Sequence, residues 1–88
     1  MKNRIKIINE KGLHARASAK FVEVVECYDA SVIVSKDGLD VTGNSIMGLM
    51  MLAASKGTYI EISTSGREAE NLSYALIALI DGYFGEGC

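Results

Sequence analysis

Apolar and polar residues alternate along four short stretches of the chain, which predicts four β-strands with one buried face each. The alternation is clearest in residues 58–64, where Ile60 and Ile62 flank Glu61. The predicted strands cover residues 4–9, 30–35, 39–42 and 58–64. Asp37-Gly38 separates the second strand from the third and is a typical hairpin turn, so these two strands are expected to pair directly.

Between the strands the apolar spacing changes to three and four residues, which predicts helices over residues 15–28, 46–54 and 68–84. The short second helix follows Asn44 and Ser45, either of which is a suitable N-cap, and Lys56-Gly57 is expected to end it. The third helix is the longest, and its predicted core stripe is Ala69, Leu72, Leu76, Leu79, Ile80 and Tyr83. Strands and helices in this order predict one α+β domain, an open sandwich with helices on one face of a single sheet.

The 88 residues suit a single domain spanning 1–88, with residues 85–88 expected to be a flexible tail. A net charge of −2 argues against nucleic-acid binding. No apolar run is long enough to insert in a membrane and no secretory signal is evident, so a cytoplasmic location is expected. Cys27 and Cys88 are too few for a disulfide scaffold and are expected to be reduced thiols.

The single histidine, His14, lies between the first predicted strand and the first predicted helix, in Gly12-Leu13-His14-Ala15-Arg16. A helix start offers unpaired N–H groups and a positive dipole end, which suit an anion. Arg16 supplies a planar set of donors that matches phosphate, and a neutral imidazole nitrogen is a nucleophile near neutral pH. This arrangement could hold a phosphoryl group on His14, with Lys11, Lys20 and Lys56 contributing to the positive field.

Other interpretations of this histidine stay open on spacing alone. It could simply cap the helix, and a cysteine partner for catalysis has no supporting motif. A metal site is not predicted, because one histidine without a cysteine or carboxylate cluster lacks ligands. No local Ser-His-Asp arrangement or nucleotide-binding loop is present, so neither a hydrolase nor any bound cofactor is expected.

A second feature is the methionine-rich helix that follows Ser45. Leu49 and Leu52 are expected to face the core, which leaves Ile46, Met47 and Met50 partly exposed, with Met51 a further candidate. Methionine surfaces adapt to several partners, although packing in the core is the alternative. A phosphate on Ser45 would add about two negative charges beside this surface.

The segments 12–22 and 44–53 together resemble the active-site and regulatory-serine segments of HPr, the histidine phosphocarrier family of the bacterial phosphoenolpyruvate-dependent phosphotransferase system. The resemblance covers nearly the whole chain. It implies an HPr-like open-faced β-sandwich of βαββαβα order, with a four-stranded antiparallel sheet and three helices on one face. It implies a phosphohistidine at Nδ1 of His14, stabilised by Arg16, in a carrier that is not a stand-alone enzyme.

The same resemblance implies the partners. An enzyme I-type protein would donate the phosphoryl group and an EIIA-type protein would accept it. Ser45 matches the serine that an HPr kinase/phosphorylase modifies in some bacteria, and Ile46, Met47 and Met50 match the docking patch, with Lys20 as a further partner-binding residue. A monomer is expected, because one site must meet several partners.

Two departures bear on the branch of the family. Ala17 stands where many members have proline, and Glu23 and Glu26 stand where sugar-transport carriers often have lysines. The chain looks more like the nitrogen-related (NPr) branch, with a regulatory role. The alternative function is a binding module that is controlled by Ser45 phosphorylation and transfers no phosphoryl group; intact His14 and Arg16 favour the carrier.

Overall fold

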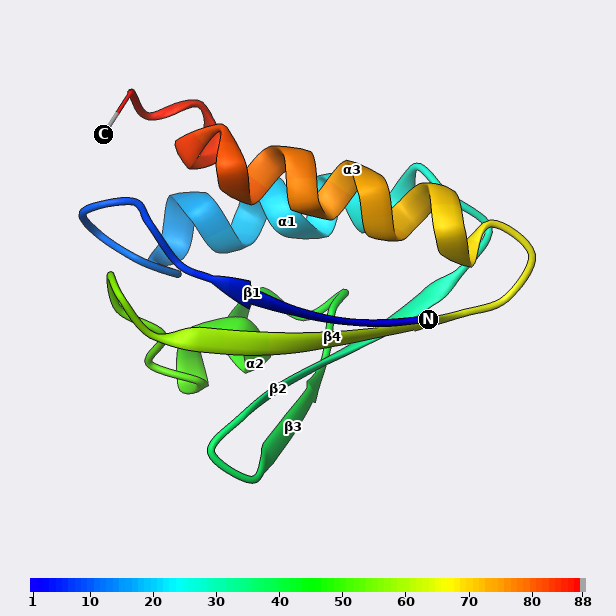
Figure 1. Cartoon of the computed structure of the whole chain (residues 1–88), viewed down its shortest axis with the longest axis horizontal. Helices are drawn as coiled ribbons and strands as arrows, with labels where there is room; N and C mark the ends of the chain where they lie inside the picture. The colour runs from blue at the N-terminus through cyan, green and yellow to red at the C-terminus, as the bar shows by residue number, and fades with distance from the viewer. Residues whose placement is uncertain (88) are drawn as a thin grey trace.

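The computed structural model describes residues 1–87 and contains every predicted strand and helix (Figure 1). In chain order the elements are β1 (Lys2–Lys6), α1 (Ala15–Glu26), β2 (Ser31–Lys36), β3 (Leu39–Thr42), α2 (Ile46–Met51), β4 (Tyr59–Ser65), α3 (Ala69–Asp81) and a 3₁₀ turn, η1 (Tyr83–Gly85). The predicted βαββαβα order is therefore confirmed. The boundaries differ by a few residues at most strand and helix ends, where hydrogen bonding is least regular.

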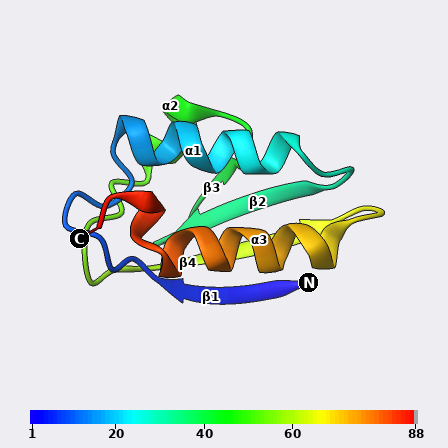
Figure 2. The ribbon, with the colours of Figure 1, turned by 90° about the horizontal axis from the view of Figure 1, so that it is seen from above.

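The strands form one antiparallel sheet in the order β1-β4-β2-β3. Ile5 of β1 lies opposite Ile60 of β4, and Val34 of β2 lies opposite Ile62. Helices α1 and α3 run across one face of this sheet, and α2 packs beside α1 and against β3 (Figures 1 and 2). Neither α1 nor α3 covers the other face of the sheet, which fits the predicted open-faced sandwich.

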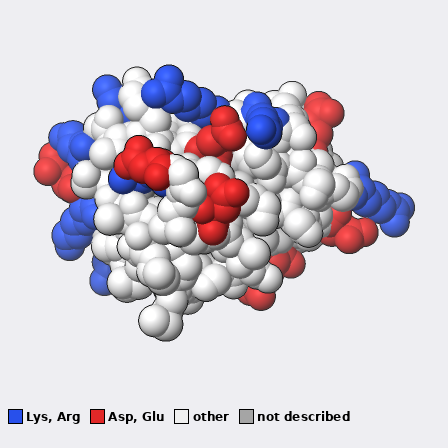
Figure 3. Space-filling model, turned by 90° about the horizontal axis from the view of Figure 1, so that it is seen from below, with Lys and Arg blue, Asp and Glu red and all other residues white. Residues whose placement is uncertain are grey.

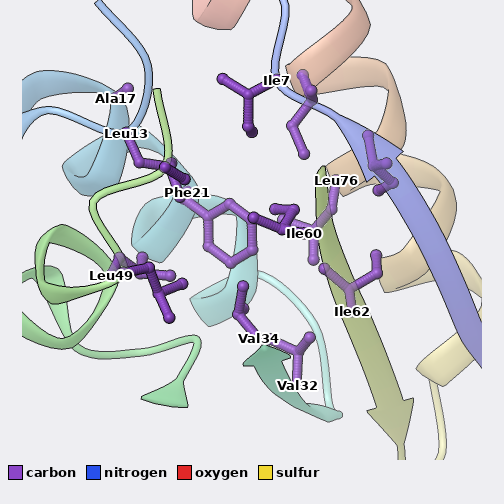
Figure 4. Close-up of a cluster of buried hydrophobic side chains, with 14 of the residues drawn as sticks. Ile7, Leu13, Ala17, Phe21, Val32, Val34, Leu49, Ile60, Ile62 and Leu76 are labelled. Carbon is purple, nitrogen blue, oxygen red and sulfur yellow. The ribbon is translucent and has the colours of Figure 1, made fainter. Parts of the chain in front are cut away.

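The core lies between the sheet and the helices. Phe21 of α1 is fully buried and points toward Val34, Ile60 and Leu49 from three other elements (Figure 4). Leu49 and Leu52 are buried as expected, whereas Met47 is 76% exposed. The alternation of Ile60, Glu61 and Ile62 therefore reports the two faces of β4 correctly.

The last turn of the third helix differs from the prediction. We expected a helix through residue 84 with Tyr83 in the core, but α3 ends at Asp81, Tyr83 is 38% exposed, and Phe84 is fully buried instead. Tyr83 and Phe84 adopt left-handed backbone conformations, with φ of 58° and 53°. This turn interrupts the helical period, so the next aromatic side chain along the sequence takes the core position.

The second helix also ends earlier than predicted, at Met51 rather than at residue 54. Ala53 has a φ of +51° and donates its N–H to the carbonyl of Met50, so the helix ends five positions before Lys56. A left-handed residue just beyond a helix is a common termination, but glycine usually occupies it. The carbonyl of Ala54 then accepts the N–H of Leu13 at 2.9 Å, which joins this turn to the His14 loop.

Replacing Ala53 by glycine is expected to stabilise the protein by up to about 1 kcal/mol, because glycine adopts a positive φ without the steric cost that alanine has. Urea unfolding of the wild type and Ala53→Gly at neutral pH measures this difference. Gly38→Ala, in the turn between β2 and β3 with a φ of +84°, is the reciprocal control and should destabilise. An Ala53→Gly variant less stable than the wild type would contradict the expectation.

The predicted tail, residues 85–88, is partly placed by the structure. Gly85 closes η1, and Glu86 contacts the His14 loop, as described below. Cys88 lies outside the described residues, and the mobility of this segment stays a prediction. Among residues 1–87, no helix is long and apolar enough to cross a membrane.

Candidate functional site

His14 is the N-cap of α1. Its backbone is extended, with φ −77° and ψ −177°, and its carbonyl accepts the N–H of Ser18 at 2.9 Å. Its Nδ1 atom accepts the backbone N–H of Arg16 at 3.2 Å, as a serine or aspartate oxygen does at most helix starts. The Nδ1 atom therefore caps the helix, and the same atom lies at the positive end of the helix dipole, where it could carry an anionic phosphoryl group.

The loop before His14 is held tightly against the turn after α2. Gly12 has a φ of +62°, and a Cβ atom there would collide with the carbonyl oxygen of Ala54. Only glycine therefore allows the loop to approach this closely. Together with the bond from Leu13 to Ala54, this contact fixes where His14 emerges.

The other ring nitrogen of His14 faces a carboxylate. Nε2 lies 2.5 Å from Oε2 of Glu86, and the two side chains are 26% and 13% exposed. Because Nδ1 accepts a hydrogen bond, the neutral ring carries its proton on Nε2 and donates it to Glu86. The Nδ1 lone pair is thereby directed at the start of α1.

Asn9 joins Glu86 to the loop. It is fully buried, and its Nδ2 donates to the carbonyl of Gly12 at 2.9 Å and to Oε1 of Glu86 at 3.1 Å. Its Oδ1 atom has no hydrogen-bond partner among the described residues. Each carboxylate oxygen of Glu86 therefore has its own donor.

Three cationic side chains surround the site. Arg16, Lys11 and Lys20 line a hollow of about 280 Å³ that also contains Glu10 and Glu86. Arg16 is exposed, and its guanidinium makes no ion pair within residues 1–87, so it is available to an anion at Nδ1. Lys20 instead donates from Nζ to the carbonyl of Phe84 at 2.6 Å, and Lys56 pairs with Glu10 at 2.7 Å.

The surroundings shift the titration of Glu86. Partial burial by itself would raise the pKa of this carboxyl, but hydrogen bonds from Asn9 and His14 and the charges of His14 and Lys20 outweigh it and lower the pKa below its ordinary value. The unfolded state has no such partners. The ionised carboxylate therefore contributes stability at neutral pH.

This shift predicts a pH-dependent stability. A lowered folded pKa gives a contribution that is present above the unfolded pKa, about 4.3, and is lost as the pH falls through the folded value. The difference in unfolding free energy between wild type and Glu86→Gln is expected to shrink as the pH falls below the ordinary pKa of a glutamate, about 4.3. Denaturant titrations at several pH values measure it, and a difference that persists at the lowest pH would contradict the assignment.

Of the two predicted N-cap candidates, Asn44 and Ser45, it is Ser45 that caps α2, with its Oγ accepting the N–H of Gly48 at 3.0 Å. Ile46, Met47, Met50 and Met51 are all exposed, and we call them the α2 patch; their exposed fractions are 39%, 76%, 44% and 68%. Figure 3 shows the molecule from below, and the part of this surface where α2 lies is a broad area without charged side chains. Met50 and His14 line one shallow hollow of about 310 Å³, so the patch adjoins the histidine.

The structure thus brings together His14, Arg16, Lys20 and the α2 patch, which the sequence singled out from separate segments. Two residues of the site were not foreseen, Asn9 and Glu86. The only signal for Glu86 is an acidic residue between two glycines after the last helix. Among residues 1–87, no group of three His, Cys, Asp or Glu side chains is arranged to hold a metal ion.

Comparison with known proteins agrees with the fold. The family model described as the PTS HPr component phosphorylation site matches residues 1–81. The phosphocarrier protein HPr of Neisseria meningitidis serogroup A is 53% identical over 87 residues, covering 99% of this chain and 98% of that protein. The phosphocarrier protein NPr of Escherichia coli is 36% identical over 86 residues, covering 98% and 97%.

Solved structures show the same architecture. The crystal structure of HPr-C-His from Thermoanaerobacter tengcongensis superposes with a TM-score of 0.93 at 38% identity, covering 98% of this chain and 97% of that one. The fold and the family match place the chain in the class of phosphocarrier proteins. The chain belongs to the HPr family of the phosphotransferase system.

Proposed function

We propose that the protein accepts a phosphoryl group on Nδ1 of His14 from an enzyme I-type donor and passes it to an EIIA-type acceptor. The observation that carries this proposal is the position of Nδ1, unprotonated at the N-terminus of α1 beside the exposed Arg16. A phosphoryl group there would accept the N–H groups of the helix start and the guanidinium donors.

The transfer is a substitution at phosphorus. The Nδ1 lone pair of His14 forms the new N–P bond while the bond between phosphorus and the donor breaks, and that electron pair stays on the donor. Transfer to the acceptor repeats the step with the roles reversed. The chain alone consumes no small molecule, because the partners supply the remaining chemistry.

The α2 patch is the proposed docking surface for both partners. It is exposed, apolar and adjacent to His14, so donor and acceptor can each cover the histidine in turn. A cytoplasmic monomer suits this use, because a second copy bound to the patch would block it.

The branch is proposed to be the nitrogen-related one, with a regulatory role. Glu23 and Glu26 are exposed on α1 and remove the basic rim that a sugar-transport carrier often presents. Sequence identity points toward the other branch, because the relative named HPr is 53% identical to this chain and the relative named NPr is 36% identical. Rates of phosphorylation by the enzyme I of each branch decide the matter, and faster acceptance from the sugar-branch enzyme would reverse the assignment.

Ser45 is proposed to be a regulatory phosphorylation site for an HPr kinase/phosphorylase. Ser45→Asp is expected to weaken binding to enzyme I by about tenfold to a hundredfold, because it places a charge beside an apolar interface. Aspartate and asparagine both cap helices well, so Ser45→Asn is the neutral control with the fold retained. Titration calorimetry measures both variants, and equal affinities for them would contradict a charge effect.

Intact-mass spectrometry tests the carrier function itself. The protein is incubated with phosphoenolpyruvate and enzyme I and then measured before and after mild acid. The expected result is the mass of one added phosphoryl group that acid removes. No added mass, with the same enzyme I active on another carrier, would instead favour the binding module controlled by Ser45.

A further inference from the structure

The segment after α3 follows a path that brings one carboxylate to the histidine. Tyr83 and Phe84 both adopt left-handed conformations, which are costly for residues with side chains. Phe84 is fully buried in the core, and its carbonyl accepts Nζ of Lys20 at 2.6 Å. These contacts anchor the chain two residues before Glu86, so they set the position of its side chain.

The Glu86 carboxylate is then fixed by two donors from the other end of the sequence. Oε2 lies 2.5 Å from Nε2 of His14, and Oε1 lies 3.1 Å from Nδ2 of Asn9. Asn9 also donates to the carbonyl of Gly12, so one buried amide sets the spacing between the carboxylate and the His14 loop. The side chain of Glu86 is only 13% exposed, which limits competition from water.

We propose that Glu86 is a positioning residue for phosphoryl transfer: its carboxylate holds the His14 ring with the proton on Nε2 and stabilises the positive ring that forms when Nδ1 takes the phosphoryl group. The proposal rests on the proposed function at His14. It adds to that function a residue 72 positions away along the chain.

Charge balance gives the carboxylate its role. The neutral ring that attacks carries one proton, on Nε2, so formation of the Nδ1–P bond leaves the ring with a positive charge and the proton in place. Glu86, ionised and hydrogen-bonded to that proton, compensates this charge. When an acceptor attacks phosphorus, the bonding pair returns to Nδ1 and the ring is neutral again. No proton has to enter or leave during either transfer.

In Ser-His-Asp catalytic triads, a buried carboxylate likewise orients the catalytic imidazole and stabilises its charged form. The position of Glu86 differs from that of Arg16 and Lys11. All three side chains line the same hollow, but only the carboxylate of Glu86 contacts the ring, at Nε2, whereas the Nδ1 atom that would carry the phosphoryl group faces the backbone N–H of Arg16. It therefore acts through His14 rather than on the phosphoryl group.

The alternative is that Glu86 only fastens the end of the chain to the loop. Glu86→Gln separates the two roles, because its amide oxygen can still accept the Nε2 proton while the charge is lost. Glu86→Ala removes the acceptor as well. Glu10→Gln is the matched control, since it makes the same charge change at a carboxylate on the same hollow that pairs with Lys56 instead.

Two measurements test the proposal on the full chain. Nitrogen-15 NMR of the unphosphorylated protein at alkaline pH is expected to show a hydrogen-bonded Nε2 proton in the wild type and Glu10→Gln, and its loss in Glu86→Ala. The phosphorylated Glu86→Gln protein is expected to release its phosphoryl group to acceptor and to water roughly threefold to tenfold more slowly than Glu10→Gln, because the charged ring is the better leaving group.

Wild-type ring signals and wild-type release rates in Glu86→Gln and Glu86→Ala would overturn the proposal, even if both variants were less stable. If Glu86→Ala did not fold, the ring signals of the wild type and the rates of Glu86→Gln would still decide it. A wild-type chain that enzyme I does not phosphorylate would overturn the proposed function, while the ring signals would separately establish or exclude the positioning by Glu86.

Discussion

His14→Asn is expected to abolish acid-labile phosphorylation while the protein remains folded. Asparagine has no nucleophilic ring nitrogen. His14 is the only histidine of the chain, so the variant has no imidazole left that could be phosphorylated. Its side-chain oxygen can still accept the N–H of Arg16 and cap α1, whereas alanine would forfeit about 0.5–2 kcal/mol of cap stability. Intact-mass spectrometry with enzyme I, alongside circular dichroism, measures both properties.

Arg16→Ala is the companion variant for this experiment. It keeps the nucleophile and removes the exposed guanidinium, so it should slow acceptance of the phosphoryl group without abolishing it. Acid-labile phosphate on His14→Asn at the wild-type level would show that another residue carries the group. That result would refute the proposed function.

Phe84→Ala is expected to lower the free energy of unfolding by about 3–5 kcal/mol, as truncation of a fully buried phenylalanine usually does. Phe84 has no exposed surface, and it holds the turn that follows α3 against the core. The total free energy of unfolding of a small domain is about 5–15 kcal/mol, so the loss is severe. Urea unfolding at neutral pH gives the value.

Tyr83→Ala is the matched control, because it truncates an aromatic residue one position away that is 38% exposed. It should cost much less than Phe84→Ala. Phe84→Ala should also loosen the pair between Glu86 and His14, which the Nε2 proton signal reports independently of stability. A larger loss for Tyr83→Ala would mean that the turn after α3 is not formed as described.

The strands and helices could be predicted because each has its own local pattern. Ile60, Glu61 and Ile62 alternate on β4, and Phe21 and Val25 share one face of α1, so a short window is enough. The ends of α2 and α3 could not be predicted in this way. Ala53, Tyr83 and Phe84 have positive φ values that ordinary propensities disfavour, and tertiary contacts impose them.

The site divides along the same line. His14, Arg16 and Ser45 lie at helix starts, where sequence signals for caps and anions are local, and their segments resemble a known family. Glu86 and Asn9 were missed because their roles depend on a contact across 77 residues. Asn9 was predicted to lie at the end of a strand, yet it is a fully buried hinge between the loop and the chain end. No periodicity in sequence reports a pairing of that kind.

The bonds that shape the histidine loop also set an order of events during folding. The N–H of Leu13 bonds to the carbonyl of Ala54, and that of Ile7 bonds to the carbonyl of Thr58. His14 pairs with Glu86. In each pair the second residue is synthesised much later than the first. Closing such long loops is entropically costly and slow compared with forming a helix. The nascent chain can form α1 early, and with it the contact between Nδ1 of His14 and the N–H of Arg16. The second ring contact, between Nε2 and Glu86, forms only after α3 has docked. A newly made carrier is thus expected to acquire the full set of contacts around His14 in one late step, together with the completed fold.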